Sequence, residues 1–255
     1  MLMISEIFWA EIKIIIPQKK SKVGRPPKDA QVVLSAIFYV MLTGIQWRCL
    51  PSYYGKPSTI HGRFRQWVKS GIFDQILELS KNAAIKQLGN PECFFSDTSF
   101  AKAPFALFGG KNPTDRSRNG VKKCMVIDMN RIILSILIAP ANKSDSKLLF
   151  PHVEKLRKYV QKPKVMITDS AWDIKKMYQD LAKEKIALLA AINVRRNKEK
   201  KRFIPRGRWR IEQVFGIQQW NRGIKFCWTK TKDSFLALCQ LASAIHNFRL
   251  IGIFV

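Results

Sequence analysis

The fold is decided by the segment FFSDTSF, residues Phe94–Phe100. Its aromatic and hydroxyl side chains favour a short β-strand. An aspartate is uncommon inside a strand, so Asp97 in the middle of this run suggests a function, although an exposed edge strand would also accommodate it. We therefore expect Asp97 to lie on the first strand of a sheet.

From residue 91 onward the sequence alternates between predicted strands and helices, and we assign 91–255 to one domain. Strands are expected over 94–100, 122–129, 132–140, 164–168 and 186–192, and helices over 144–160, 173–185 and from about 208 to 222. The order βββαβαβα predicts an α/β domain with a mixed sheet. In such a sheet the first and fourth strands can be neighbours.

The first 90 residues are expected to form a separate, all-helical domain. Asp29 can cap a long apolar helix that ends at Gly44, and Ser58 or Thr59 can cap a second, basic and aromatic helix. A further helix is expected over 72–88. A basic helix after a turn is typical of a helix-turn-helix-like DNA-binding domain. An ordinary helical bundle with a solvated basic face fits the periodicity equally well.

The charge of the chain indicates a polyanionic partner. Its 45 Lys and Arg residues outnumber 18 Asp and Glu residues, which gives a formal net charge of +27. Such self-repulsion favours a protein that lies along phosphates. The longest nearly unbroken apolar run, Val32–Leu42, has 11 residues, whereas a membrane-spanning helix needs roughly 20. The five cysteines are scattered without a C-x-x-C pair, which predicts buried thiols in a reducing cytosol and neither disulfides nor a zinc site.

Three carboxylates are placed where metal-dependent chemistry would need them. Asp97 lies in the first predicted strand, Asp169 follows the fourth, and Glu212 lies on the last predicted helix beside an apolar stripe. Open α/β sheets bind ligands at the carboxyl ends of their strands. Hard oxygen ligands of this kind suit Mg²⁺, and a pair of such ions can promote phosphoryl transfer.

Each of these residues also has an ordinary structural explanation. Asp169 could cap the following helix, which is the more common role of such an aspartate. Glu212 could pair with Arg208 one helical turn earlier. Asp128 is the main competitor for a catalytic role, but its place in a predicted hairpin turn explains it without function. The combination of three carboxylates carries more weight than any one of them.

A basic stretch leads directly to Glu212. Nine Arg or Lys residues lie between Arg195 and Arg210, with a single acid, Glu199. Such a run is usually a solvated loop, but beside a carboxylate cluster it can hold a DNA backbone. Trp172, just after Asp169, is either a core aromatic residue or a platform on which an unpaired base stacks, and the core role is slightly favoured.

The chain also contains a series of short motifs, each of which is weak evidence alone but which together occur in a consistent order along the sequence. They are Gly24-Arg25-Pro26, Gly44-x-x-Trp47-Arg48-x-Leu50-Pro51, Ser58-Thr59, Arg63-Phe64-x-x-Trp67, Asp97-Thr98-Ser99, Pro113-Thr114-Asp115-Arg116, Gly120-Val121-Lys122, Ala141-Asn142-x-x-Asp145-Ser146, Asp169-Ser170-Ala171-Trp172-Asp173 and Arg208-Trp209-x-x-Glu212. In these motifs, over nearly its whole length, the chain resembles the DDE transposases of bacterial insertion sequences, within the IS-four/IS-five superfamily and closest to the IS-five group.

The resemblance implies a ribonuclease-H-like fold, a catalytic triad of Asp97, Asp169 and Glu212, and two Mg²⁺ or Mn²⁺ ions held by these three residues. It also implies cleavage of double-stranded DNA at the element's ends, transfer of the freed 3′ ends to target DNA, a homodimer on the DNA, and a bacterial cytoplasmic location with no membrane partner. The side chains expected at the DNA are Arg25, Arg63, Arg65, Lys69, Lys122, Trp172, Arg195, Arg196, Lys200, Lys201, Arg202 and Arg208.

The sequence departs from the family pattern at a few positions. Pro205 stands where relatives often have Tyr, Gln219 where they often have Lys or Arg, and Ala171-Trp172 where Gly-Tyr is common. The 42 residues between Asp169 and Glu212 leave no room for a large inserted β-domain. Two alternatives therefore stay open beside an active transposase: a decayed copy that only binds DNA, and a ribonuclease-H-like nuclease that only hydrolyses.

Overall fold

A mixed β-sheet organises the chain in the computed structural model, which describes residues 3–17, 26–162, 164–193, 199, 201 and 203–254. Its strands within these ranges are β1 (Cys93–Lys102), β2 (Gly110–Lys111), β3 (Asn119–Asp128), β4 (Ile133–Pro140), β5 (Lys164–Thr168) and β6 (Ile186–Ala190). They lie side by side in the order β4-β3-β1-β5-β6, and the short β2 pairs with the start of β3. Strand β1 is antiparallel to β3 and parallel to β5. This arrangement confirms the predicted mixed sheet and the ribonuclease-H-like fold.

The turn between β3 and β4 forms at Asp128, as the sequence predicts. Asp128 is buried at the end of β3, and its Oδ1 accepts a hydrogen bond of 2.7 Å from the backbone N–H of Ile132. Arg131 has a φ of 68°, the left-handed conformation that closes the turn. The structural explanation of Asp128 therefore holds.

The described part of the first 90 residues is helical and contains no strand, as predicted. They are α1 (Glu6–Ile12), α2 (Ala30–Thr43), α3 (Pro57–Lys69) and α4 (Ile72–Leu88), with short 3₁₀ turns at Trp47–Cys49 and Ser52–Tyr54. Asp29 caps α2 through the N–H of Val32, and Gly44 ends this helix at a φ of +70°. The predicted cap of α3 is wrong. This helix begins at Pro57, before Ser58 and Thr59, because a proline ring suits the first helical turn.

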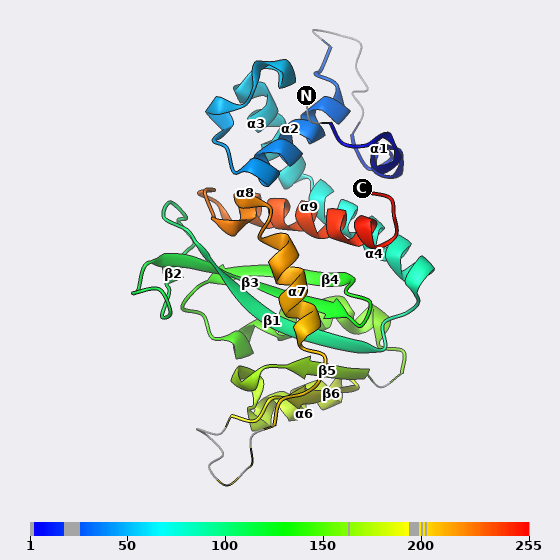
Figure 1. Cartoon of the computed structure of the whole chain (residues 1–255), viewed down its shortest axis with the longest axis vertical. Coiled ribbons are helices and arrows are strands. Elements are labelled where there is room, and N and C mark those ends of the chain that lie inside the picture. The colour runs from blue at the N-terminus through cyan, green and yellow to red at the C-terminus, as the bar shows by residue number, and fades with distance from the viewer. Residues whose placement is uncertain are drawn as a thin grey trace.

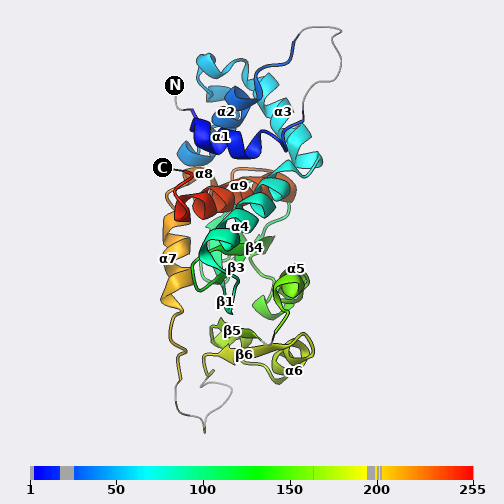
Figure 2. The ribbon, with the colours of Figure 1, turned by 90° about the vertical axis from the view of Figure 1, so that its right-hand side faces the viewer.

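A long C-terminal helix, α9 (Lys232–Leu250), lies between the N-terminal helices and the sheet (Figures 1 and 2). Its contacts with α4 are extensive, and Phe248 meets Phe8 of α1 edge to face with ring centroids 5.4 Å apart. Asn247 of α9 bonds both backbone groups of Ile133 on β4. One hydrophobic core thus runs from the N-terminal helices to one face of the sheet. The division of the chain at residue 90 stays a prediction.

The opposite face of the sheet is covered by α5 (Phe150–Leu156) and α6 (Lys175–Lys183), around a second hydrophobic core. The single helix predicted over 144–160 is wrong. It is divided into 3₁₀ turns at Asp145–Leu148 and Arg157–Tyr159 on either side of α5. Pro151 lacks an N–H and would clash with a preceding helical turn, so the α-helix can begin no earlier than just before this residue.

The helix predicted over 208–222 is shorter than expected. It is observed as α7 (Trp209–Gln218), which crosses the sheet face beside β1 in Figure 1. A separate short helix, α8 (Arg222–Lys225), begins where the predicted helix ends. Helix α8 contacts α2 so closely that a Cβ atom on Gly223 would lie 2.8 Å from the carbonyl oxygens of Val40 and Met41. Among the described helices, none is long and apolar enough to cross a membrane.

Candidate active site

Two half-buried aspartates come from neighbouring parallel strands. Asp97 lies in the middle of β1, and Asp169 follows the last residue of β5. The two strands pair directly, with Phe95 opposite Ile167, so the predicted neighbourhood of the first and fourth long strands is confirmed. Burial raises the pKa of the Asp97 carboxyl, and repulsion from Asp169 adds to this effect. Burial likewise raises the pKa of Asp169.

Backbone hydrogen bonds hold both carboxylates in place. Asp97 Oδ1 accepts a bond of 2.8 Å from the N–H of Thr98, and Asp169 Oδ1 accepts one of 3.0 Å from the N–H of Ala171. Asp169 therefore caps the 3₁₀ turn Ser170–Trp172 and not the following helix α6, which begins at Lys175 after Ile174, so the predicted helix cap is wrong. That cap occupies only one of its carboxylate oxygens.

Arg208 connects the aspartates to α7. Its Nη2 atom lies 3.2 Å from Asp97 Oδ2 and 3.8 Å from Glu212 Oε1. Its positive charge also acts on Asp169, where it lowers the pKa against the larger effect of burial. Its Nε atom is buried and has no hydrogen-bond partner in the structure. A buried donor without an acceptor costs free energy, and only the Nη atoms of this guanidinium are placed to bond an incoming anion.

Glu212 lies on α7 one turn after Arg208, and its side chain is 63% exposed. It contacts Arg208, which is the ordinary pairing that the sequence also allowed. Within the described residues no group of three Asp, Glu, His or Cys side chains is close enough together to hold a metal ion. The structure thus brings Asp97, Asp169 and Arg208 together and leaves Glu212 at the edge of the site.

Lys122 does not lie at the surface. Its side chain is only 8% exposed, and its Nζ atom is 2.8 Å both from Asp145 Oδ1 and from the carbonyl oxygen of Lys143. The same ammonium lies 5.2 Å from the centre of the Phe100 ring. A direct DNA contact by Lys122 is therefore wrong in this structure, because its donors are used inside the protein.

Lys122 and Asp145 both influence Asp169 instead. The Asp145 charge raises the pKa of Asp169 and the Lys122 charge lowers it, both less than burial does. The sequence motif around Asp145 pointed to this residue without giving it a role. Its ion pair with Lys122, across 23 positions of the chain, becomes visible only in the fold.

Trp172 belongs to the core. It is 1% exposed and lies in the second hydrophobic core with Met177 and Leu181 of α6. Its role as a stacking platform for DNA is therefore wrong, because no face of the indole is accessible. The slightly favoured alternative, a core aromatic residue, is the observed one.

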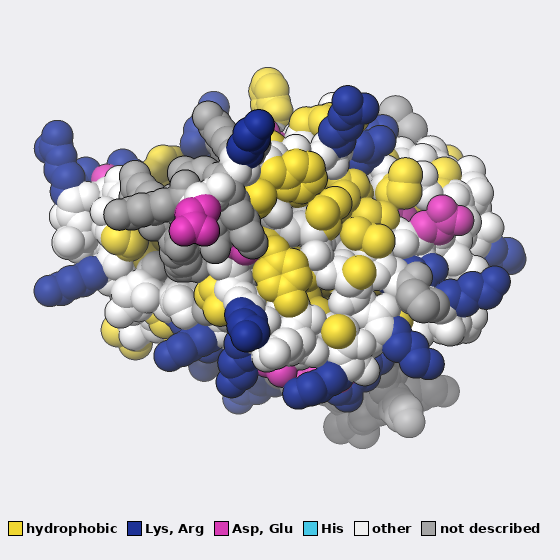
Figure 3. All heavy atoms as spheres, turned by 90° about the horizontal axis from the view of Figure 1, so that it is seen from below, with side chains coloured by type: hydrophobic (Ala, Val, Ile, Leu, Met, Phe, Trp, Pro, Cys, Tyr) yellow, Lys and Arg dark blue, Asp and Glu magenta, His cyan; other side chains and the backbone are white. Residues whose placement is uncertain are grey.

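The other predicted DNA contacts that the structure describes lie on α3 and at Lys201. On α3, Arg65 and Lys69 are exposed and Arg63 is half-buried, and Lys201 is exposed as well. Figure 3 shows the end of the molecule near β5 and β6, where Lys and Arg side chains surround a group of hydrophobic ones. The predicted contacts that lie outside the described residues are Arg25, Arg195, Arg196, Lys200 and Arg202.

Two curated proteins of bacteria are similar to part of the chain. A 16.2 kDa uncharacterised protein of insertion element IS402 from Burkholderia cepacia is 33% identical over 82 residues, 30% of this chain and 56% of that protein. An uncharacterised protein of Sinorhizobium fredii is 25% identical over 81 residues, 31% of this chain and 65% of that protein. The chain thus spans between half and two thirds of the length of these relatives.

Two solved structures are also similar. A piggyBac transposase synaptic complex with hairpin DNA aligns with 97% of this chain and 71% of its own, at 11% identity and a TM-score of 0.46. The Mos1 mariner paired-end complex with Mn aligns with 89% of this chain and 80% of its own, at 11% identity and a TM-score of 0.30.

Family models match most of the chain in two consecutive segments. Residues 4–77 match a model of transposases of the IS4/5 family. Residues 88–247, more than half of the chain, match the model of the transposase DDE domain. The chain therefore belongs to the DDE transposases, and its N-terminal region is of the IS4/5 type.

Proposed function

We propose that this protein is an insertion-sequence transposase that binds the terminal inverted repeats of its element, cleaves the DNA and joins the 3′ ends to target DNA. The observation that carries the proposal is the pair of half-buried carboxylates, Asp97 and Asp169, on adjacent parallel strands with Arg208 against them. Membership of the DDE transposases supports it.

The donors of this site fit a hard divalent cation. Asp97 and Asp169 offer only oxygen ligands. Their carboxylates repel each other, and a bound cation would relieve this repulsion. Asp97, Asp169 and Glu212 would hold two Mg²⁺ or Mn²⁺ ions, with the exposed Glu212 side chain turning away from Arg208 toward the aspartates. When bound, the ions would activate the attacking oxygen and stabilise the charge that develops on the phosphate.

Arg208 would then contact the DNA backbone. Its Nε atom is buried without an acceptor, and its Nη2 atom faces Asp97 at 3.2 Å. A guanidinium forms paired hydrogen bonds with phosphate oxygens as well as with carboxylates. We expect Arg208 to orient the scissile phosphate over the aspartates, since positioning and electrostatics supply most of the catalysis in phosphoryl transfer.

The N-terminal helices would recognise the inverted repeats. Helix α3 presents Arg65 and Lys69 to solvent, and the net charge of +27 favours binding along a DNA backbone. Two transposon ends must be cut and joined together, so a homodimer on the DNA is expected. The proposed compartment is the bacterial cytoplasm.

The test uses purified protein, a labelled duplex that carries the element's own end, and Mg²⁺ or Mn²⁺, beside the Glu212→Gln variant. Metal-dependent nicking at the end, absent in the variant, is the expected result. Strand transfer into a second duplex separates a transposase from a nuclease that only hydrolyses. Tight end binding without cleavage by either protein would contradict the proposal and leave a decayed copy that retains DNA recognition.

A further inference from the structure

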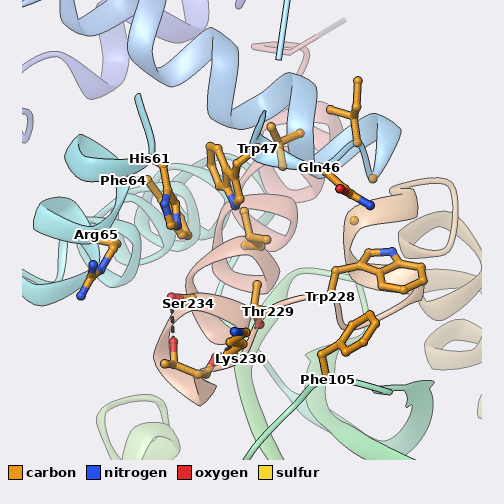
Figure 4. Close-up of a pocket in the computed structure, with 16 residues that line it drawn as sticks. Gln46, Trp47, His61, Phe64, Arg65, Phe105, Trp228, Thr229, Lys230 and Ser234 are labelled. Carbon is orange, nitrogen blue, oxygen red and sulfur yellow. Dashed lines mark hydrogen bonds between the residues drawn. The ribbon is translucent and has the colours of Figure 1, made fainter. Parts of the chain in front are cut away.

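A pocket of about 550 Å³ lies between the N-terminal helices and the C-terminal part of the chain, away from the aspartates. Figure 4 shows two groups of rings on its walls. Trp47 lies against His61 and Phe64, with ring centroids 5.0 Å apart in both pairs. Phe105 and Trp228 stand on the other wall, 6.1 Å apart, and are 59% and 50% exposed. Exposed aromatic faces of this kind suit a flat, aromatic ligand.

The polar groups of the pocket favour an anionic ligand. None of its sixteen lining residues, all within the described part of the chain, is Asp or Glu, whereas Arg65 and Lys230 contribute positive charge. Burial, helped by the nearby Arg65, lowers the pKa of His61, so its ring is mainly neutral at pH 7. A ligand with a flat aromatic part and a phosphate would match both the rings and the cations.

The pocket is preformed, because backbone contacts fix its walls. The N–H of Cys227 donates to the carbonyl oxygen of Lys102 at 2.8 Å, and the N–H of Leu107 donates to that of Lys230 at 3.2 Å. The side chain of Asn119 holds the loop of Phe105 through the carbonyl oxygens of Ala103 and Ala106. A rigid site loses little entropy when a ligand binds.

The pocket lies between two regions that are proposed to contact DNA, helix α3 and the end of the sheet that follows β1. Helix α3, which exposes Lys69, also supplies His61 and Arg65 to one wall. The loop with Phe105 directly follows β1, the strand of Asp97. A duplex that runs from α3 toward the aspartates would therefore pass the mouth of the pocket.

We infer that this pocket receives a single unpaired nucleobase of the bound DNA, which stacks on Phe105 and Trp228 while Arg65 and Lys230 contact the flanking phosphates. The inference rests on the proposed action on DNA and deepens it. Stacking of bases on aromatic side chains tolerates any sequence, because every base presents a flat π face. An unpaired base costs least to extrude from a duplex, so the pocket selects DNA that is already distorted.

The test measures binding to a duplex with one bulged 2-aminopurine and to the same duplex with that base paired, in EDTA so that no cleavage occurs. We expect the protein to bind the bulged duplex at least about five-fold more tightly, with quenching of the 2-aminopurine fluorescence. Phe105→Ala and Trp228→Ala should remove the preference and the quenching and leave binding of the paired duplex unchanged. Trp228→Phe, which keeps a ring, should retain most of both.

Trp220→Ala is the matched control, because Trp220 is 80% exposed and does not line the pocket. Equal affinities for the two duplexes, or the same loss in Trp220→Ala, would overturn the inference. The outcome is independent of catalysis. If the protein prefers the bulged duplex but never cleaves DNA, the base-binding role of the pocket is supported and the proposed transposase activity is contradicted. If it cleaves DNA without that preference, the activity is supported and the role of the pocket is contradicted.

Discussion

Nη2 of Arg208 lies 3.2 Å from Oδ2 of Asp97, although the two residues are 111 positions apart in the chain. This contact fixes the start of α7 against β1, the strand at the centre of the sheet. It also places a positive charge beside Asp97, one of two half-buried carboxylates that repel each other.

Asp169→Asn should abolish metal-dependent DNA cleavage and leave DNA binding within about a few-fold of wild type. Asparagine keeps the size of the side chain and an oxygen that can accept the bond from the N–H of Ala171, so the turn should survive. Nicking assays and fluorescence anisotropy measure the two quantities. Asp180→Asn, on α6 and paired with Lys183, is the control and should cleave normally. A large loss of DNA binding in Asp169→Asn would assign the residue a structural role.

Lys122→Met should destabilise the fold by an amount on the order of 3 kcal/mol, because it leaves Asp145 without its buried partner near Asp169. The double variant Lys122→Met/Asp145→Asn should recover part of this loss, since no unpaired charge remains. Urea unfolding of the wild type, both single variants and the double variant gives the coupling between the two residues. Strictly additive effects would mean that the ion pair contributes nothing to stability.

Asp128 should make the fold less stable as the pH rises from about 4 to about 6. Burial raises the pKa of its carboxyl to about 6 in the folded protein, whereas the unfolded chain releases this proton near its ordinary pKa of 3.8. Between these values the folded state binds more protons, so stability falls with increasing pH and is constant above 6. Asp128→Asn should remove this term, which is on the order of 1–3 kcal/mol.

The measurement for Asp128 is the difference in Tm between wild type and Asp128→Asn at several pH values. The difference should grow in favour of the variant from pH 4 to pH 6 and then stay constant. Asparagine still offers an oxygen to the N–H of Ile132, so the turn is kept. A difference that does not depend on pH would show that Asp128 titrates normally in the folded protein.

Much of this architecture is predictable from local sequence signals. The caps at Asp29 and Gly44, the turn at Asp128 and the strand that ends before Asp169 all depend on neighbours in the chain. Helix α9 is not predicted from the sequence, and every residue from Ala237 to Phe248 is buried in it. A helix enclosed on all sides has apolar residues on every face, and the 3.6-residue period fades.

Some features of the candidate site are likewise predictable from local sequence, and others depend on the folded chain. The neighbourhood of Asp97 and Asp169 follows from strand order, which the alternation of strands and helices indicates. The burial of Lys122 and Trp172 depends on how α5, α6 and the neighbouring turns pack against the sheet. No local sequence pattern predicts this packing. The aromatic pocket combines residues from α3, the loop after β1 and the segment before α9, so it exists only in the folded chain.

Arg65→Gln together with Lys69→Gln should weaken duplex binding and reduce its dependence on salt. Both side chains are exposed on α3, the helix proposed to contact the inverted repeats. Each phosphate contact that is lost should lower the slope of log K against log salt by about 0.9. The control is Lys175→Gln with Lys176→Gln, which removes the same charge from α6. Equal slopes for the two double variants would mean that α3 has no special contact with DNA.

Arg208→Ala should separate two roles of the guanidinium. Its contacts with Asp97 Oδ2 and Glu212 Oε1 compete with a divalent cation for the same carboxylate oxygens, so their loss should increase the affinity of the DNA-free protein for Mn²⁺. Cleavage should nevertheless fall, because the guanidinium no longer orients a phosphate over the aspartates. Titration calorimetry with Mn²⁺ measures the first effect and a nicking assay the second. Arg208→Lys keeps the charge but not the planar fork, so it should bind Mn²⁺ much like wild type and still cleave poorly. Unchanged Mn²⁺ affinity in Arg208→Ala would mean that the arginine acts on the DNA alone.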